Sequence, residues 1–300
     1  MPIGHCLLAL AVVSIWGFSF VVIKLGIGAT PPLLLGALRF AFAALPAVFF
    51  IPRPKAGWGL LTAYGFFLGV AQFGLLFAAI GLGMPASLAS VVMQAQVFFT
   101  ILFAGIALGE KPGPHQVLGG LVACLGLVLI AWPRLTGSDA IPFLMTVAAA
   151  AAWGVANIVS KRAGRIDMLG FIVWTSLIPP LPLLALSLWL EGPVRVEGAL
   201  LGINGGTLAA VAYLAYPTTL FAFGVWSYLL SRHSAATVTP FALLVPVTGI
   251  LGAAVILGER MRPIEGIGGA VIVLGLAINV FGLRLVRRFR PVPDPEAPPV

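Results

Sequence analysis

The feature that most constrains this chain is an internal repeat that covers both of its halves. Leu108 to Pro114 reads LGEKPGP, and 149 residues later Leu257 to Pro263 reads LGERMRP. Further matches follow in the same order in each half: Trp16-Gly17 with Trp153-Gly154, Lys24 with Lys161, Gly119-Gly120 with Gly268-Gly269, and Gly126 with Gly275. A repeat of this length predicts two duplicated halves that fold alike.

The composition indicates that lipid surrounds most of the chain. Hydrophobic residues make up 60% of it and charged residues 9%, whereas a soluble domain carries about 25% charged residues. The net charge of +8 lies in short loops and the tail, so it reports membrane topology and not nucleic-acid binding. Two duplicated halves that consist mainly of apolar residues are typical of secondary transporters.

Neither cysteine belongs to a metal-binding or redox pattern. Cys6 and Cys124 lie in apolar segments without a C-x-x-C or His-rich neighbourhood, and we expect no metal site, cofactor or structural disulfide. The N-terminus lacks a basic segment, and its small-x-small pattern, Ala9 to Ala11, falls inside the apolar run. We therefore expect the first apolar segment to be a retained helix and not a signal peptide.

Hydropathy predicts an all-α integral membrane protein with ten transmembrane helices in two inverted five-helix repeats around a central cavity. A span needs about 20 apolar residues, and the sequence offers ten: 6–27, 32–51, 58–80, 86–108, 114–132, 140–161, 168–190, 205–230, 235–257 and 264–284. The expected units are a first repeat over 1–135, a second over 136–284, and a basic, then Pro-rich, cytoplasmic tail over 285–300.

Positive charge orients these helices. With the N-terminus inside, eleven lysines and arginines fall in inside loops and the tail, and five fall outside. This bias predicts a multi-pass protein of the bacterial inner membrane with both termini in the cytoplasm. Because each repeat has an odd number of helices, the second copy crosses in the opposite sense, and substrate is expected between the halves near the midplane.

The positions of two repeated motifs resemble those of a known family. Trp-Gly near the middle of the first and sixth helices and Leu-Gly-Glu at the ends of the fourth and ninth are similar to EamA-type members of the drug/metabolite transporter superfamily, especially the YddG-type exporters of aromatic and neutral amino acids. The resemblance implies a basket-shaped exporter with a cavity lined mainly by helices 1, 3, 4, 6, 8 and 9. One departure is Pro240 and Pro246 in the ninth helix, which have no counterpart in the fourth, so we expect the halves to bend differently.

The acidic residues all fall at predicted helix ends, in loops or in the tail. A proton-coupled pump normally keeps an ionisable group inside the membrane. Their placement favours a neutral or zwitterionic substrate and facilitated diffusion, although coupling through another group stays an alternative.

Arg39 is the charge that lies well inside a predicted span. A charge at that depth costs a few kcal/mol unless it is paired or snorkels. It is a possible anchor for a substrate carboxylate, and hydrogen bonding to helix-end carbonyls is the structural alternative.

Aromatic and amide side chains are the main substrate-binding candidates. Trp16 with Ser19 and Trp153 with Asn157 form repeat-related pairs on one helix face. Their indoles could hold an apolar side chain, and close helix packing beside Gly17 and Gly154 is the alternative. The remaining candidates are Tyr64 and Gln72 on helix 3, Gln94 on helix 4, and Tyr213, Tyr216 and Trp226 on helix 8. On helix 8, Tyr216, Thr219, Phe223 and Trp226 are expected to form one stripe at an α-helical spacing.

Gln94 and Gln96 cannot both point squarely at a cavity, since they are two residues apart on one helix. We favour Gln94 because it continues the polar stripe of Ser87 and Ser90. At the helix ends, Lys24, Lys161, Glu110 and Glu259 are expected to be gate-forming or structural.

These features together predict an inner-membrane exporter of neutral or aromatic amino acids that works by alternating access and facilitates diffusion of its substrate. The alternative is export of another small metabolite or drug, purine-like or neutral and amphipathic, with proton coupling. We expect no enzyme activity and no catalytic residues, because no His/Asp/Glu cluster falls within the predicted spans. The expected partners are a small-molecule substrate and the lipid bilayer, and the expected state is a monomer.

Overall fold

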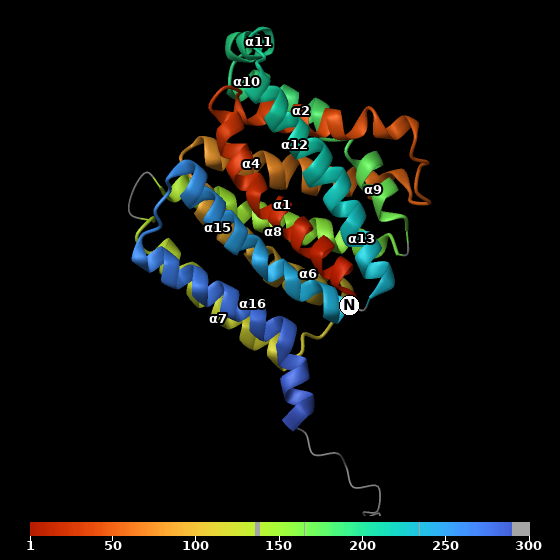
Figure 1. Ribbon diagram of the computed structural model, residues 1–300, viewed down its shortest axis with the longest axis vertical. Coiled ribbons are helices and arrows are strands. Elements are labelled where there is room, and N and C mark those ends of the chain that lie inside the picture. Colours follow the sequence, from red (N-terminus) through yellow and green to blue (C-terminus); the bar gives the residue numbers. More distant parts are fainter. Residues whose placement is uncertain (136–138, 165, 234, 290–300) are drawn as a thin grey trace, which may run out of the picture.

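The structure is a computed structural model that describes residues 1–135, 139–164, 166–233 and 235–289. Within those residues, ten helical spans are long and apolar enough to cross a membrane (Figure 1). The first half consists of α1 (Ile3–Ile27), α2 (Pro32–Ala44) with η1 (Ala47–Phe49), α3 (Trp58–Tyr64) with η2 (Gly65–Gln72) and α4 (Phe73–Gly81), α5 (Ala86–Val92) with η3 (Met93–Ala95) and α6 (Gln96–Leu108), and α7 (Pro114–Ala131).

The second half follows the same plan. It consists of α8 (Ala140–Arg162), α9 (Met168–Thr175) with α10 (Pro180–Leu190), α11 (Pro193–Leu201), α12 (Gly205–Ala215) with η4 (Tyr216–Phe221) and α13 (Ala222–Arg232), α14 (Ala235–Val238) with η5 (Thr239–Leu243) and α15 (Leu244–Leu257), and α16 (Pro263–Phe289). The expectation of an all-α protein with ten spans is confirmed.

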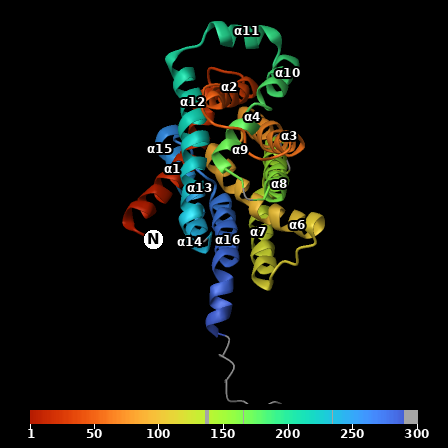
Figure 2. The same cartoon turned by 90° about the vertical axis from the view of Figure 1, so that its right-hand side faces the viewer.

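Two regions differ from the expected layout. Helix α11 lies outside the ten spans, across the top of Figure 2 between α10 and α12. Helix α16 continues to Phe289, past the expected end of the last span. The Pro-rich tail from 290 onward and the repeat junction at 136–138 lie outside the described residues.

The α-helix of the ninth span is interrupted, and so is that of the fourth span, which has no proline at the equivalent position. The fourth span contains the 3₁₀ segment η3, and the ninth contains the 3₁₀ segment η5, at positions that overlap under the 149-residue shift. The expectation that the halves bend differently stays a prediction, but an interruption occurs in both of them. In both spans the tighter turn separates a short first helix from a longer second one.

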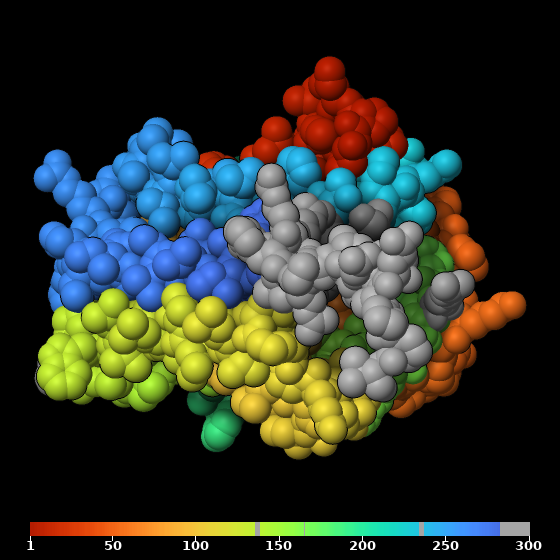
Figure 3. All heavy atoms as spheres, turned by 90° about the horizontal axis from the view of Figure 1, so that it is seen from below, coloured from red at the N-terminus to blue at the C-terminus, as the bar shows by residue number. Residues whose placement is uncertain are grey.

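The two halves meet along a glycine seam between α7 and α16 (Figures 1 and 3). A Cβ atom added to Gly119 would lie 2.6 Å from the carbonyl oxygen of Gly275, and one added to Gly275 would lie 2.6 Å from that of Gly119. Gly126 and Gly268 meet in the same way, at 2.6 and 2.8 Å. Because Gly119 is equivalent to Gly268, and Gly126 to Gly275, the repeat exchanges the two contacts, as a pseudo-two-fold axis requires.

The same exchange relates the contacts of the two Trp-Gly pairs. A Cβ atom on Gly17 of α1 would lie 2.5 Å from the Val245 carbonyl oxygen and 2.8 Å from the Gly249 nitrogen of α15. A Cβ atom on Gly154 of α8 would lie 3.1 Å from the Thr100 nitrogen of α6. Thr100 and Gly249 are repeat-equivalent, so α1 packs on α15 as α8 packs on α6.

A buried ion pair fixes the start of α16. Arg134, which follows α7, lies with Nη2 2.5 Å from Oε1 of Glu265 in the first turn of α16, and Nε donates to the same oxygen. Both side chains are buried. Removing one partner of such a pair costs about 3–5 kcal/mol, which makes this contact structural.

The glycine seam generates a stability prediction. Gly126→Ala places a methyl group against the backbone of α16, which cannot yield as a side chain can, and we expect a loss of about 1–3 kcal/mol. The measurement is thermal unfolding in detergent. Gly120→Ala is the matched control on the same helix, because its Cβ would lie 3.6 Å from a Phe98 ring carbon, an ordinary contact. Equal melting temperatures for the two variants would contradict the assignment of the seam.

Candidate functional site

Two π-helical segments mark the candidate site. Segment η2 interrupts the third span and η4 the eighth, and under the 149-residue shift η2 falls on residues 214–221, which contain η4. π-Helical turns occur mostly as single insertions and are frequent at functional sites. Pro217 belongs to η4, so the proline lies in a π-helical turn. Its equivalent, Leu68, shows that the turn forms without proline.

An aromatic cluster lies next to η4. The Trp16 ring of α1 contacts the rings of Phe223 and Trp226 on α13, each with a centroid distance of 5.3 Å. The Trp16 indole donates from Nε1 to the carbonyl oxygen of Thr218 at 3.2 Å. Phe223 belongs to this cluster, and it also forms part of the wall of a small cavity beside Arg39. The three rings therefore connect the middle of α1 to that cavity.

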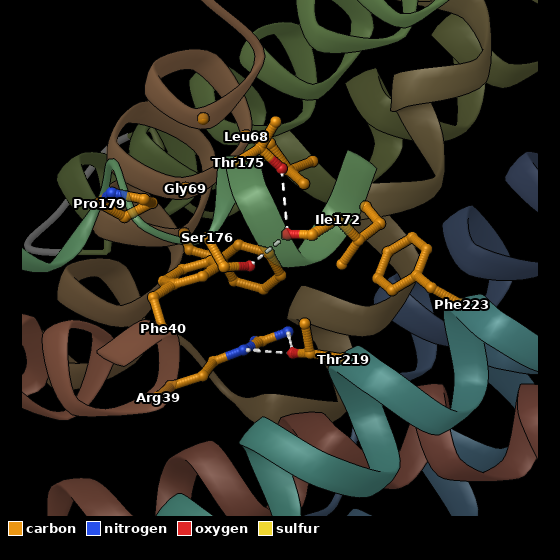
Figure 4. Close-up of a pocket in the computed structure, with 12 residues that line it drawn as sticks. Arg39, Phe40, Leu68, Gly69, Ile172, Thr175, Ser176, Pro179, Thr219 and Phe223 are labelled. Atoms are coloured by element: carbon orange, nitrogen blue, oxygen red, sulfur yellow. Dashed lines mark hydrogen bonds between the residues drawn. The ribbon is translucent and has the colours of Figure 1, made fainter. Parts of the chain in front are cut away.

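Arg39 is fully enclosed among spans 2, 3, 7 and 8 (Figure 4). Its side chain is 1% exposed, and its guanidinium carbon lies 3.8 Å from the centre of the Phe73 ring. Nε and Nη2 both donate to Oγ1 of Thr219, at 3.3 and 3.2 Å. Nη1 has no hydrogen-bond partner. A cavity of about 10 Å³ adjoins the guanidinium, with Thr175, Ser176 and Phe223 in its wall.

Two further buried polar atoms on the π-helical segments lack partners. They are Oε1 of Gln72, at the end of η2, and Oγ1 of Thr218 in η4. Buried polar side-chain atoms are usually hydrogen-bonded, and an unpaired one needs an explanation. Gln72 and Thr218 are each next in sequence to a residue that contacts the Arg39 guanidinium, namely Phe73 and Thr219.

Asn157 of α8 contacts two polar side chains of the fourth span. Its Nδ2 donates to Oε1 of Gln96 at 2.9 Å and to Oγ1 of Thr100 at 3.0 Å. The glutamine beside Asn157 is therefore Gln96, and the expectation that Gln94 faces the cavity stays a prediction. Both glutamines are half-buried. Trp153 is also half-buried and packs against two apolar clusters.

The remaining aromatic candidates are spread apart. Tyr64 is buried against Phe171, with a ring centroid distance of 4.7 Å. Tyr213 donates to the carbonyl oxygen of Ile15. Tyr216 is 40% exposed, because the π-helical turn that begins there changes the register of the stripe expected on the eighth span. Ser19 is buried and donates to the carbonyl oxygen of Trp16.

The glutamates that end spans 4 and 9 share a backbone arrangement but have different partners. Gly109 and Gly258 precede them with φ of +67° and +64°, values that favour glycine because it lacks a Cβ. The backbone nitrogen of Glu110 donates to the Ala104 carbonyl, and that of Glu259 to the equivalent Ala253 carbonyl.

Glu259 is bound to the start of the fourth span. Its carboxylate accepts hydrogen bonds from the backbone nitrogens of Ala86 and Ser87, at 3.0 and 2.9 Å, and from the Ser87 hydroxyl at 2.7 Å. Glu110 instead forms an exposed ion pair with Lys161, at 2.5 Å. Lys24, the counterpart of Lys161, donates to the carbonyl oxygen of Ile80.

Spans 4 and 9 meet on the Glu259 side, where α5 packs on α15 and a Cβ atom on Gly249 would lie 2.7 Å from Cβ of Ser90. On the Glu110 side, Figure 2 shows α6 and α14 on opposite sides of α16 in that view. The sequence singled out both glutamates, and it placed Ser87 and Phe223 on stripes of their helices, but it did not single out Thr100. The contacts of Thr100 follow from packing between spans, which periodicity along one helix does not report.

Comparisons with known proteins place the chain in a family. Residues 3–132 and 140–281 match the EamA-like transporter family. The chain belongs to this family. It is therefore a membrane transporter and not an enzyme.

Several relatives are similar over nearly their whole length. A protein of Escherichia coli strain K12, named a probable amino-acid metabolite efflux pump, is 41% identical, and the alignment covers 92% of this chain and 95% of that one. A protein of Salmonella typhimurium with the same name is 42% identical, covering 94% and 97%. A probable terminal-alkyne amino-acid exporter of Streptantibioticus cattleyicolor is 27% identical, covering 94% and 92%. A solved crystal structure has a TM-score of 0.65 at 22% identity, covering 96% and 98%, which supports the fold alone.

A histidine pair beside the N-terminus predicts a pH effect. Nδ1 of His5 lies 2.6 Å from Nε2 of His233, just past α13. Burial, the neighbouring His5 and the N-terminal amino group lower the pKa of His233 from its ordinary 6.5. The fold favours the neutral ring, so stability falls as the pH drops from 6.5 towards the lowered pKa.

We expect His233→Gln to flatten the dependence of the melting temperature on pH between about pH 7 and pH 5, where histidine titrates. His115→Gln, at the start of α7, is the control. An unchanged pH profile in His233→Gln would show that this pair does not carry the effect.

Proposed function

We propose that this transporter exports neutral amino acids, aromatic ones among them, and related metabolites by alternating access, with both termini in the cytoplasm. The names of the relatives from Escherichia coli, Salmonella typhimurium and Streptantibioticus cattleyicolor support the substrate class. The aromatic cluster around Trp16 supports an apolar side chain on the substrate, because such rings provide large apolar contact area.

The observation that carries alternating access is the unequal state of two equivalent glutamates. Inverted repeats exchange roles when a transporter turns from one membrane face to the other. In this structure Glu259 joins spans 4 and 9 at one mouth, while Glu110, at the other mouth, is paired with Lys161 of the sixth span. With the termini inside, the mouth that Glu259 joins faces outward and the mouth at Glu110 faces the cytoplasm.

The opposite state follows by exchanging the halves. Under the 149-residue shift, Ala86 and Ser87 fall on residues 235 and 236, where α14 begins. Closing the cytoplasmic mouth would transfer Glu110 from Lys161 to the start of α14, and opening the outer mouth would release Glu259 to Lys24. Each glutamate then acts as a latch that keeps one mouth closed, and only one of the two mouths is closed at a time.

Substitution of the two glutamates tests this exchange. Hydrogen bonds to a charged group contribute about 1.5–3 kcal/mol, so Glu259→Gln is expected to shift the population about tenfold towards the outward-open state. Glu110→Gln is expected to shift it towards the cytoplasm-open state. Spin-label distances across each mouth, measured in liposomes, report both shifts. Glu197→Gln, an exposed carboxylate on α11, is the control, and shifts of the same sign in both variants would refute the exchange.

Transport itself is tested with purified protein in liposomes and a panel of labelled amino acids. We expect saturable movement of aromatic and branched neutral amino acids, with Trp16→Ala and Trp153→Ala reducing the rate at unchanged membrane expression. An imposed proton gradient should leave the rate unaltered, because the described carboxylates lie outside the spans or at their ends. Absence of transport for the whole panel would replace amino acids with another metabolite class.

A further inference from the structure

The charge of Arg39 has no counter-charge in the part of the chain that the structure describes. Its five N–H groups face one hydroxyl oxygen, that of Thr219, and the ring of Phe73. Thr219 also donates to the Leu214 carbonyl. A guanidinium can donate five hydrogen bonds, and here Nη1 makes none.

A buried charge in this condition is costly. Moving an ion out of water costs several kcal/mol, and good geometry with an opposite charge is what recovers it. The other deeply buried arginine, Arg134, has such a partner in Glu265. Arg39 is equally enclosed and lies within a span, so the fold retains a charge that it does not itself neutralise.

The surroundings of Arg39 match the carboxylate and the side chain of an amino acid. A carboxylate needs N–H donors, and Nη1 of Arg39 is unpaired. Phe223 forms part of the cavity wall and contacts Trp16, so an apolar side chain can extend from the guanidinium towards the aromatic cluster.

We propose that Arg39 binds the carboxylate of the exported amino acid, and that its side chain lies against Phe223 and Trp16. This inference rests on the proposed function and names the chemical group that the site selects. The expected site lies between spans 2, 3, 7 and 8, although the resemblance to the family placed the cavity mainly among spans 1, 3, 4, 6, 8 and 9.

The cavity beside Arg39 is closed in this conformation. Its volume of about 10 Å³ is about what one water molecule requires, so a carboxylate enters only when the walls separate. The wall contains Gly65 and Gly69 of η2, which pack directly against the seventh span: a Cβ atom on Gly65 would lie 2.6 Å from the Thr175 carbonyl oxygen. Separation of η2 from the seventh span is therefore the movement that admits substrate.

The test compares L-phenylalanine with L-phenylalaninamide, which lacks the carboxylate, in binding to the purified full chain by calorimetry. We expect the wild-type protein to bind the amino acid at least tenfold more tightly than the amide. Arg39→Met should lose this preference and bind L-phenylalanine at least tenfold more weakly. Arg39→Lys, which keeps the charge, should recover part of it.

Stability separates a binding role from a structural one. If Arg39 serves the substrate, Arg39→Met removes an uncompensated buried charge, and the ligand-free protein should melt at the same temperature or higher. A melting temperature several degrees lower with unchanged binding would show that Arg39 is structural, and would overturn the proposal. Arg53→Met is the matched control, because Arg53 also stacks on a ring, that of Trp58 at 4.2 Å, and is exposed; it should keep wild-type binding.

Failure of the carboxylate site can be told apart from failure of the proposed function. If wild-type protein binds L-phenylalanine and its amide equally, the carboxylate site is refuted while the amino-acid exporter stands. If neither L-phenylalanine nor L-leucine binds or is transported, the proposed function fails, and the carboxylate site fails with it.

Discussion

Close backbone contact between glycine-bearing helices is the constraint on which this fold depends. Lipid provides no hydrophobic force between helices, so spans associate through packing and hydrogen bonds at small residues. Gly119 with Gly275 and Gly126 with Gly268 join the halves, and Gly17 and Gly154 seat the first and sixth spans. Each of these contacts has a repeat-equivalent partner, so the packing itself imposes the symmetry of the molecule.

That symmetry explains why the local irregularities come in pairs. Segments η2 and η4 fall at overlapping positions of the repeat, and so do η3 and η5. Only one member of each pair contains proline. The surrounding spans therefore determine where the helical pattern changes, and proline accommodates a turn that the packing already requires. Irregular backbone of this kind is tolerated in a membrane only where protein covers it.

The sequence predicted the ten spans well, because length and hydropathy are local properties. Motif spacing singled out the two glutamates, whose roles stay predictions. The sequence could not predict which glutamine meets Asn157, since Gln94 and Gln96 differ only by rotation about one helix and the neighbouring span decides. It also placed Tyr216 on a stripe with Trp226, because an α-helical period was assumed across a π-helical turn. Arg39 stood out as a charge within a span, but its lack of a partner is visible only in three dimensions.

The two latches are unequal in one respect. Ser87 adds a hydroxyl to the hydrogen bonds of Glu259, and its counterpart in the repeat, Ala236, has none. Under the proposed exchange of the two halves, this difference favours the cytoplasm-facing state of the empty carrier. A resting bias cannot change the equilibrium distribution of a passively moved solute, which detailed balance fixes. It lowers the solute concentration of half-saturation on the cytoplasmic side, and it lowers the maximal rate of export relative to that of import by the same factor.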